Sequence, residues 1–396
     1  MAEAVIVDVV RTPAGKGKPG GALSWTHPAD LLAMVLRGLV ERNDLDPALV
    51  DDVIAGCVSQ VGEQALNIAR SATLGAGFPE TVPATTVDRQ CGSSQQAVHF
   101  AAQGVMAGAY DIVIAAGVES MSRVPLGVAA MGTSTTGELM RRRYPELVQQ
   151  GISAELMAAR WQFGREELDA YSAESHRRAA AAAGSGAFAR ELLPVDAENA
   201  HGERITHDTD ETIRPATTLE GLAGLKPAFR DEAIAARFPE IGWHITPGNS
   251  SPLTDGASAA LIMSAERAEQ LGLRPRARFA GFAVRGDDPL LMLSAPIPAT
   301  REVLKKVGLA IGDIDAYEVN EAFAPVPLAW AREVGADPAR LNPRGGAIAL
   351  GHAMGSSGTR LLATLLNYLE DTGGRYGLQT MCEAGGIANA TIVERL

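Results

Sequence analysis

Short apolar runs alternate along the chain with stretches whose apolar positions recur at helical spacing. Residues 2–10 (AEAVIVDVV), 50–60 (VDDVIAGCVSQ) and 111–120 (DIVIAAGVES) predict buried strands. Residues 29–43 and the stretch that follows Gly92 predict helices. Because strands that alternate with helices form sheets covered on both faces, this pattern predicts an α/β protein with a largely parallel sheet.

The pattern changes between about residues 121 and 248. This part is richer in Arg, Glu, Met and polar residues, its strand signals are weak, and it contains helical pieces such as 165–183. At 258–263 (SAALIM) a strand resumes, and 276–284 (RARFAGFAV) opens a second α/β half. We therefore predict an N-terminal half of residues 1–120 plus 249–271, an inserted cap at 121–248, and a C-terminal half at 272–396.

The second half resembles the first. GSSQQAVHFAAQGVMAGAYDIVIAAG begins at Gly92, and GSSGTRLLATLLNYLEDTGGRYGLQTMCEAGG begins at Gly355. Both run from Gly-Ser-Ser through a predicted helix and strand to a glycine turn. Two ordinary units can match by chance, whereas a true duplication would bring the two Gly-Ser-Ser turns to a shared centre.

Composition narrows the class of protein. The 396 residues carry a net charge of −12, which argues against nucleic-acid binding, since that needs a surplus of Lys and Arg. The start MAEAVIVDVVRTP lacks the basic region of a signal peptide, and no apolar run approaches the ~18 residues of a membrane helix. Three widely spaced cysteines favour a reducing compartment, and no Cys/His cluster has metal-ligand spacing. We expect a cytoplasmic enzyme with no metal and no membrane span.

Cys91, in DRQCGSSQQA (88–97), stands where a strand-like segment gives way to a helix. A helix N-terminus presents free N–H groups and a positive dipole end, and both favour a thiolate and lower its pKa. Gly92 lets a substrate or another backbone approach closely. The stretch predicts either a nucleophile with N–H groups that hold an oxyanion or a buried inert cysteine.

Three more side chains lie at glycine-framed ends of predicted strands. His352, in NPRGGAIALGHAMGSSG, could supply the base that a thiol nucleophile needs. Cys382 ends GLQTMC and could move protons, or it could be a core cysteine. Asn320, in YEVNEAFAPV, could orient a water or a carbonyl, or it could be an ordinary N-cap. His99, within the first predicted helix, is expected to be a packing or surface residue.

Many motifs, in order, resemble those of the thiolase family, the acetyl-CoA acyltransferases. They are VRTPAGK (10–16), DRQCGSSQQA, GVESMSRVP (117–125), LKPAF (225–229), GNSSPLTDGASA (248–259), NEAFA (320–324), GGAIALGH (345–352) and MCEAGG. DRQCGSSQQA and RYGLQTMCE are most similar to actinobacterial thiolases of steroid-ring catabolism. The resemblance implies a thiolase fold, with duplicated βαβ halves in five αβαβα layers and an inserted cap domain.

The resemblance also implies residue roles. Cys91 would be acylated, and His352 would take its proton and help to hold the thioester oxygen. Asn320 would position a water in the same oxyanion site, and Cys382 would exchange protons with the acetyl-CoA carbanion and the CoA thiol. The backbone N–H groups of Cys91 and Ala384 would form a second oxyanion hole. The residues that would contact CoA and its pantetheine arm are Arg214, Phe229, Ser251 and Phe323.

These roles imply thiolytic cleavage of a 3-ketoacyl-CoA to acetyl-CoA, or another short acyl-CoA, and a shortened acyl-CoA. Coenzyme A would be a co-substrate, and no cofactor would be bound permanently. The partners would be acyl-CoA and CoA, and the assembly a homodimer or homotetramer.

Three positions depart from the family pattern. Ala353 stands where the family usually has Pro, so the loop that holds His352 would be less rigid. Ala384 stands where Gly is usual, and Ala would be strained there if the site needed a positive φ. Gln150 replaces a Met that often lines the acyl site. Since the four catalytic side chains remain, we expect activity.

Four alternatives stay open. Biosynthetic formation of acetoacetyl-CoA uses the same groups in reverse. A decarboxylating ketosynthase pairs one cysteine with two histidines, and a cysteine hydrolase would not need Cys382. A non-catalytic acyl-CoA or lipid carrier is suggested by Ala353 and Ala384, and acylation of Cys91 would separate it from the enzymes.

Overall fold

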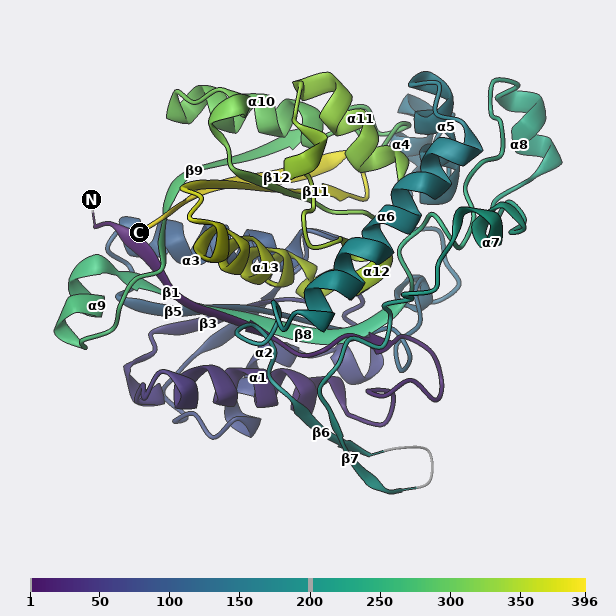
Figure 1. Cartoon of the computed structure of the whole chain (residues 1–396). Helices are drawn as coiled ribbons and strands as arrows, with labels where there is room; N and C mark the ends of the chain where they lie inside the picture. The colour runs from purple at the N-terminus through teal and green to yellow at the C-terminus, as the bar shows by residue number, and fades with distance from the viewer. Residues whose placement is uncertain (1, 199–201) are drawn as a thin grey trace.

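The protein is an α/β structure of five layers, in which two sheets alternate with three layers of helices (Figure 1). The computed structural model describes residues 2–198 and 202–396. The layer between the two sheets is helical and mostly buried, as the predicted duplicated fold requires.

The first sheet follows the order β1 (Ala4–Arg11), β8 (Thr254–Ser264), β5 (Ile112–Ser120), β3 (Asp52–Gly56) and β4 (Ala84–Val87), and the short β2 (Gly15–Lys16) pairs with β8. Its outer face is covered by α1 (Pro28–Arg42) and α2 (Ile68–Gly75) (Figure 1). Proline at the first position of α1 fits a helix start, because its missing N–H would have no partner there.

The second sheet follows the order β9 (Ala277–Gly286), β12 (Ile387–Arg395), β11 (Tyr376–Glu383) and β10 (Ala316–Val319). Its outer face is covered by α10 (Pro296–Val307) and α11 (Pro325–Val334), while α9 (Ala265–Gln270) leads into β9 (Figure 1). A short antiparallel pairing of β1 with β9 joins the two sheets along one edge.

The central layer consists of α3 (Ser93–Met106) and α13 (Ser357–Thr372), which begin at the two Gly-Ser-Ser turns. A Cβ added at Gly358 would lie 2.8 Å from the Cα of Gln95, and the backbone N–H of Thr359 donates to Ser94 Oγ at 3.1 Å. Gly355 packs equally closely on Cys57. The expected meeting of the two turns at a shared centre is confirmed.

The prediction of a largely parallel sheet is wrong, because most neighbouring strands pair in the antiparallel direction. Only β3–β4, β3–β5 and β10–β11 are parallel, whereas β8 runs antiparallel to both neighbours and β12 does likewise. The reason is topological: β11 and β12 form a hairpin, and the long segment after β5 brings the chain back as β8 from the opposite end.

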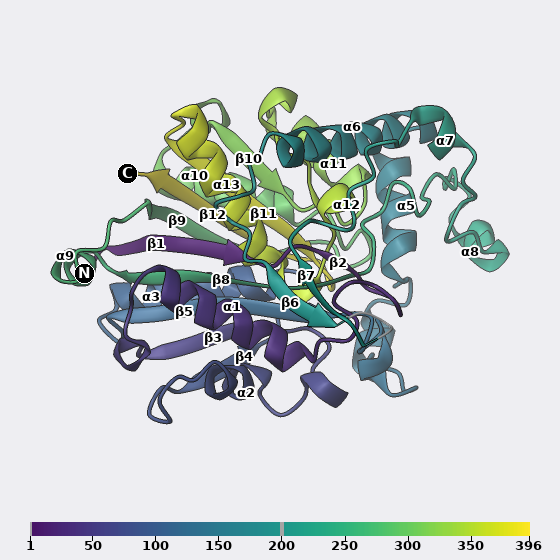
Figure 2. The same ribbon diagram turned by 60° about the horizontal axis from the view of Figure 1, so that its bottom comes forward.

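Residues 121–248 contain α4 (Glu138–Arg143), α5 (Gln150–Arg160), α6 (Arg165–Gly184), α7 (Leu219–Ala223), α8 (Glu232–Arg237) and the hairpin β6 (Val195–Glu198) with β7 (Arg204–His207). The helices α5 to α8 gather at one end of the layers (Figures 1 and 2). There α6 contacts the loop that leads to α12 (Ala347–Leu350), since Gly346 N donates to Ser175 Oγ at 3.1 Å. The division into three parts stays a prediction.

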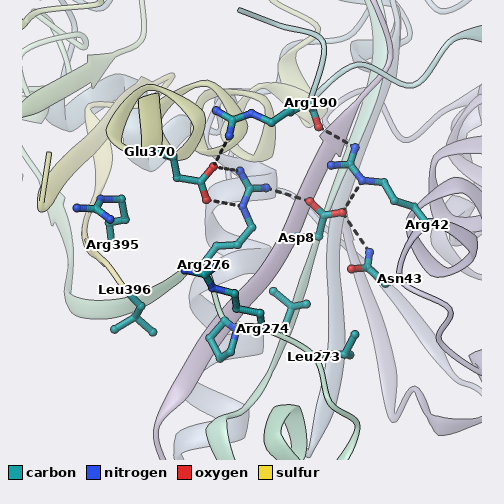
Figure 3. A pocket seen from close by; sticks show the side chains of 12 residues that line it. Asp8, Arg42, Asn43, Arg190, Leu273, Arg274, Arg276, Glu370, Arg395 and Leu396 are labelled. Atoms are coloured by element: carbon teal, nitrogen blue, oxygen red, sulfur yellow. Dashed lines mark hydrogen bonds and ion pairs between the residues drawn. The ribbon is translucent and has the colours of Figure 1, made fainter. Parts of the chain in front are cut away.

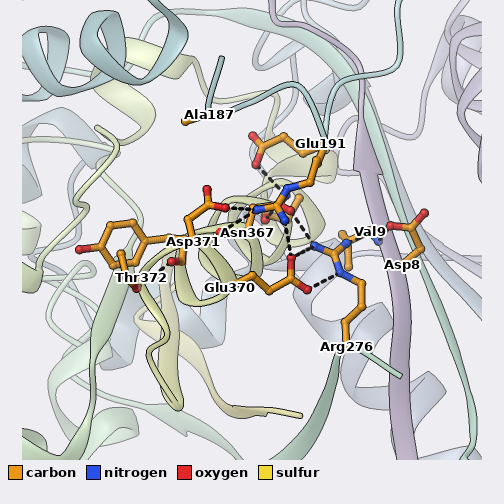
Figure 4. A network of polar contacts seen from close by, with 12 residues as sticks. Asp8, Val9, Ala187, Glu191, Arg276, Asn367, Glu370, Asp371 and Thr372 are labelled. Atoms are coloured by element: carbon orange, nitrogen blue, oxygen red, sulfur yellow. Dashed lines mark hydrogen bonds and ion pairs between the residues drawn. The ribbon is translucent and has the colours of Figure 1, made fainter. Parts of the chain in front are cut away.

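An ion-pair cluster joins the two sheets at a distance from this end (Figure 4). Arg276 donates to both carboxylate oxygens of Glu370 at 2.8 Å, to Asp8 Oδ1 at 3.0 Å and to Asn367 Oδ1 at 2.6 Å. Asp8 also pairs with Arg42 at 2.9 Å. The cluster thus links β1, α1, α13 and the segment before β9.

The same cluster lines a surface hollow of about 590 Å³ (Figure 3). Glu370 and Ser357 lie at opposite ends of α13, so the hollow is roughly 20 Å along that helix from its N-terminal end. The N–H groups of Arg276 donate to carboxylates and to Asn367. We therefore interpret the ion-pair cluster around Arg276 as a structural clamp that holds the two sheets together. Among the described residues, no helix combines the length and apolar character needed to cross a membrane.

Replacing Arg276 with Met should therefore destabilise the protein by about 1–3 kcal/mol, because hydrogen bonds to charged groups are lost and Glu370 and Asp8 stay partly buried. The measurement is the urea midpoint. Arg278→Met is the control: this more exposed Arg pairs with Glu394 and Glu3, and its loss should be smaller. Equal losses would contradict the clamp.

Candidate active site

The predicted catalytic side chains lie where α3 begins and where β10 and β11 end. Cys91 stands directly before the N-cap of α3 and is 5% exposed, while Cys382 is fully buried near the end of β11. Cys91 packs in one apolar cluster with Met354 and Met381, which are close neighbours of His352 and Cys382 in the sequence. The structure therefore gathers residues from both halves around Cys91.

Hydrogen bonds determine the tautomer of His352. Ser357 Oγ donates to the carbonyl of Ala353 at 2.9 Å, so it accepts from His352 Nδ1 at 2.6 Å. With the proton on Nδ1, His352 Nε2 carries the lone pair and accepts from Asn320 Nδ2 at 3.3 Å. A histidine oriented in this way can accept a proton at Nε2.

The prediction that the helix end lowers the pKa of Cys91 is wrong for the free protein. Burial, and next the charge of Glu383, raise the pKa of Cys91 to about 12. Burial, and next the charge of Arg360, lower the pKa of His352 to about 3. Desolvation disfavours both charged forms, so the resting site holds a neutral thiol beside a neutral base.

The loop that carries Asn320 is fixed by the buried carboxylate of Glu321. This carboxylate accepts from Tyr171 at 2.7 Å, Ser175 at 2.7 Å, Asn342 at 2.9 Å and the backbone N–H of Ile348 at 3.0 Å. The side chain of Glu321 is completely buried, so this carboxylate is not a solvated surface charge. Asn320 Oδ1 is buried with no partner among the described residues, so it is free to accept from a ligand.

Cys382 and Ala384 lie on either side of the end of β11. Burial, and next the charge of Cys91, raise the pKa of Cys382 well above its ordinary value. Ala384 does not have a positive φ; Gly385 (φ 92°) and Gly386 (φ 77°) have one instead. The backbone strain that an alanine with a positive φ would carry is therefore absent. In the described part of the chain, no backbone carbonyl accepts from the N–H groups of Cys91 and Ala384.

Ala353 likewise fits its position. Its φ of −72° is one that proline would also adopt, and its carbonyl accepts from Ser356 N and Ser357 Oγ, both at 2.9 Å. These bonds hold the turn after His352 in place of a proline ring, and His352 N donates to Thr254 Oγ1 at 2.9 Å.

Three of the four residues expected to contact CoA lie together. Ser251 donates to the carbonyl of Ala322 through its backbone N–H at 3.0 Å and its Oγ at 3.2 Å. The rings of Phe229 and Phe323 meet edge to face at 6.0 Å. Arg214 lies apart on an exposed loop, with its backbone N–H on His176 Nδ1 at 3.2 Å. Its expected contact with CoA stays a prediction.

Gln150 begins α5, and its Nε2 is buried with no partner among the described residues. The following Gly151 has no room for a side chain, because the Phe229 ring lies against it. Gln150 is therefore next to the aromatic pair of Phe229 and Phe323.

Sequence reasoning missed Ser357, Glu119 and the environment of His99. Ser357 belongs to the second Gly-Ser-Ser repeat and lies five positions after His352, which was the available signal. Glu119 binds the backbone N–H groups of Val58, at 3.0 Å, and Gly355, at 2.9 Å, across the two halves. His99 is buried, as a packing residue would be, but it also joins a polar network, with Nε2 2.7 Å from Thr391 Oγ1.

The lowered pKa of His352 predicts acid sensitivity. Between pH 6.5 and about 3 the unfolded chain binds a proton at this residue and the folded chain does not, so stability falls as pH falls. From pH 7.5 to 5.0, urea unfolding should show wild type losing about 2 kcal/mol more than His352→Gln. Parallel losses in both proteins would contradict the buried neutral histidine.

Several known proteins are similar to this chain in sequence and in structure. The family description "Thiolase, N-terminal domain" matches residues 4–266, and "Thiolase, C-terminal domain" matches residues 273–395. The steroid 3-ketoacyl-CoA thiolase FadA6 of Mycobacterium tuberculosis is 49% identical over 405 residues, covering 100% of this chain and 95% of that protein. The 3-ketoacyl-CoA thiolase of Erwinia tasmaniensis is 44% identical over 400 residues and covers 100% of both chains.

The crystal structure of the Bacillus anthracis acetyl-CoA acetyltransferase superposes with a TM-score of 0.89 at 36% identity, covering 100% of this chain and 99% of that one. The resemblance drawn from the motifs is thereby confirmed in sequence and in fold. The chain belongs to the thiolase family of acyltransferases.

Proposed function

We propose that the protein cleaves a 3-ketoacyl-CoA with coenzyme A through an acyl-Cys91 intermediate. The observation that carries this proposal is the oriented lone pair on His352 Nε2, in a buried site with two thiols. A buried neutral thiol needs such a base, because it does not ionise by itself near neutral pH.

In the first half-reaction, His352 Nε2 takes the proton of Cys91 as its sulfur attacks the ketone carbon. The bond between that carbon and the α-carbon then breaks, and the electron pair leaves as the enolate of acetyl-CoA. Cys382 gives its proton to this carbanion. The backbone N–H groups of Cys91 and Ala384 are free to stabilise one oxyanion, and Asn320 with His352 the other.

In the second half-reaction, the Cys382 thiolate takes the proton of the CoA thiol. The CoA sulfur attacks the acyl carbon, and Cys91 leaves and recovers its proton from His352. Both groups return to their starting protonation states, so one base and one second thiol suffice for the cycle. The reverse sequence would form a 3-ketoacyl-CoA by the same groups.

The acyl chain is proposed from the relatives. FadA6 is named for a steroid substrate, and the other relatives are named for 3-ketoacyl-CoA. We therefore propose that the protein acts in degradation, and that the first substrate to test is a 3-ketoacyl-CoA with a steroid-derived chain. Phe229, Ser251 and Phe323 are proposed to line the pantetheine path, with Arg214 at its outer end. A cytoplasmic location and a homodimer or homotetramer belong to the same proposal.

The carrier alternative rested on Ala353 and Ala384, and neither residue is strained in the structure. The ketosynthase alternative needs a second histidine in the place held by Asn320. Neither alternative gains a specific observation in its favour.

Acylation of Cys91 tests the proposal directly. Incubation with acetyl-CoA should add one acetyl group to the wild type, detected by intact-protein mass, and none to Cys91→Ala. Free CoA should remove the group from the wild type. A Cys91→Ala protein that is still acetylated would contradict the assignment, and binding of CoA without modification would favour the carrier.

Ser357→Ala should lower kcat/KM for a 3-ketoacyl-CoA roughly 10- to 100-fold, because the His352 ring loses the partner that fixes its tautomer. Ser356→Ala is the matched control, since the Ser356 Oγ forms no hydrogen bond within the described residues. An equal effect of the two substitutions would show that the turn, and not the histidine tautomer, is affected.

A further inference from the structure

Glu383 places a carboxyl group against the turn that carries Cys91. It is the last residue of β11, directly after Cys382, and it is fully buried. Its Oε1 accepts from the backbone N–H of Asn389 at 3.1 Å, whereas Oε2 is buried with no partner among the described residues. A carboxyl group with one free oxygen therefore lies inside the site.

The contact between Glu383 and Gly92 is unusually close. Gly92 has φ −89° and ψ 10°, which other residues adopt easily, so backbone freedom does not explain the glycine. A Cβ added at Gly92 would overlap the carboxylate and lie 2.6 Å from Glu383 Cδ. Glycine is needed here because the carboxyl group occupies the space of a side chain.

Anchoring alone does not account for a carboxyl group at this position. A glutamine would accept the same bond from Asn389 without the cost of burying an ionisable group, and an unpaired buried charge is strongly unfavourable. The charge of Arg89 acts on Glu383, yet no hydrogen bond joins the two side chains, and Arg89 Nε is also buried without a partner in the described chain. The carboxyl group is thus left able to change its charge.

We propose that Glu383 is a positioning residue for the nucleophile. Its carboxyl group packs against the Gly92 turn and supports it, and when this group is charged it favours the protonated form of Cys91. In the neutral form Glu383 supports the turn without opposing the thiolate. In the charged form it repels the thiolate, and His352 removes the proton from Cys91 less readily. This inference rests on the proposed role of Cys91 as the acylated group.

The groups that surround Glu383 set the range of pH in which this occurs. The loop before α3 contributes Asp88, Arg89 and Cys91, and β11 contributes Cys382. The charge of Glu119, on β5, acts on Cys91. From α3, His99 Nδ1 reaches the same region through Asn389 Nδ2 at 3.3 Å. Burial outweighs the attraction of Arg89 and raises the pKa of Glu383 to about 8.

The test is the rate at which iodoacetamide alkylates Cys91, measured by peptide mass from pH 6 to 9.5 in wild type and Glu383→Gln. Below about pH 7 the two rates should be equal, since Glu383 is then neutral in wild type. Above pH 8 the variant should react faster, by about tenfold at pH 9.5, because no charge opposes the thiolate. A purely structural role would change the rate by a constant factor at every pH.

Glu318→Gln is the matched control. Glu318 is buried, its Oε1 lacks a partner in the described chain, and burial raises its pKa to about 8, but its charge does not act on Cys91. Its alkylation profile should match wild type. The proposal is overturned if Glu383→Gln also matches wild type, or if Glu318→Gln shows the same divergence above pH 8.

Wild type alone provides a second test if Glu383→Gln does not fold. Its alkylation rate should rise less than tenfold per pH unit between pH 8 and 9.5, because Glu383 ionises there. A full tenfold rise per unit across the range would overturn the proposal. Alkylation reports thiol ionisation and not turnover, so a Cys91 that diverges as expected but is never acetylated would overturn the proposed function alone.

Discussion

The close packing of two helix N-termini between two sheets is the constraint on which the site depends. The segments that begin α3 and α13 pack closely on their surroundings, since a Cβ added at Gly358 would lie 2.8 Å from the Cα of Gln95 and one added at Gly355 would lie 2.8 Å from the Cα of Cys57. A single methyl group at either glycine would separate the halves. Because Cys91 precedes one turn and His352 the other, this packing brings the proposed nucleophile and the proposed base into one enclosed space.

Enclosure determines the chemistry of the site as well as its position. Burial raises the pKa of Cys91 and lowers that of His352, so the resting pair is neutral and proton transfer can accompany attack. Such a site relies on orientation, which Ser357, Thr254 and Asn320 provide through hydrogen bonds to His352. The carboxyl group of Glu383 lies in the same enclosed space, against Gly92.

Buried polar groups join helix α6 to the segments that hold Asn320 and His352. Glu321 binds Tyr171 and Ser175 of α6, and it also binds Asn342 and the backbone of Ile348 on the way to His352. The loop that holds Asn320 is thereby fixed both by α6 and by the segment that leads to His352. At the other end of the central helix α13, the Arg276 cluster joins the sheets by ion pairs (Figure 4). The end of α13 near the proposed active site therefore does not need ion pairs to hold the sheets together.

The sequence by itself determined the alternation of strands and helices and the repeated Gly-Ser-Ser turns, because these depend on local pattern. Its motifs also predicted the set of Cys91, His352, Cys382 and Asn320. The direction of the strands was not determined, since antiparallel β8 and β12 result from where the chain returns and not from their composition. The protonation of Cys91 was misjudged, because a helix end is a local feature and burial is not. Only the tertiary structure placed Ser357 on His352 and Glu383 against Gly92, since contacts between distant or oppositely directed side chains depend on packing.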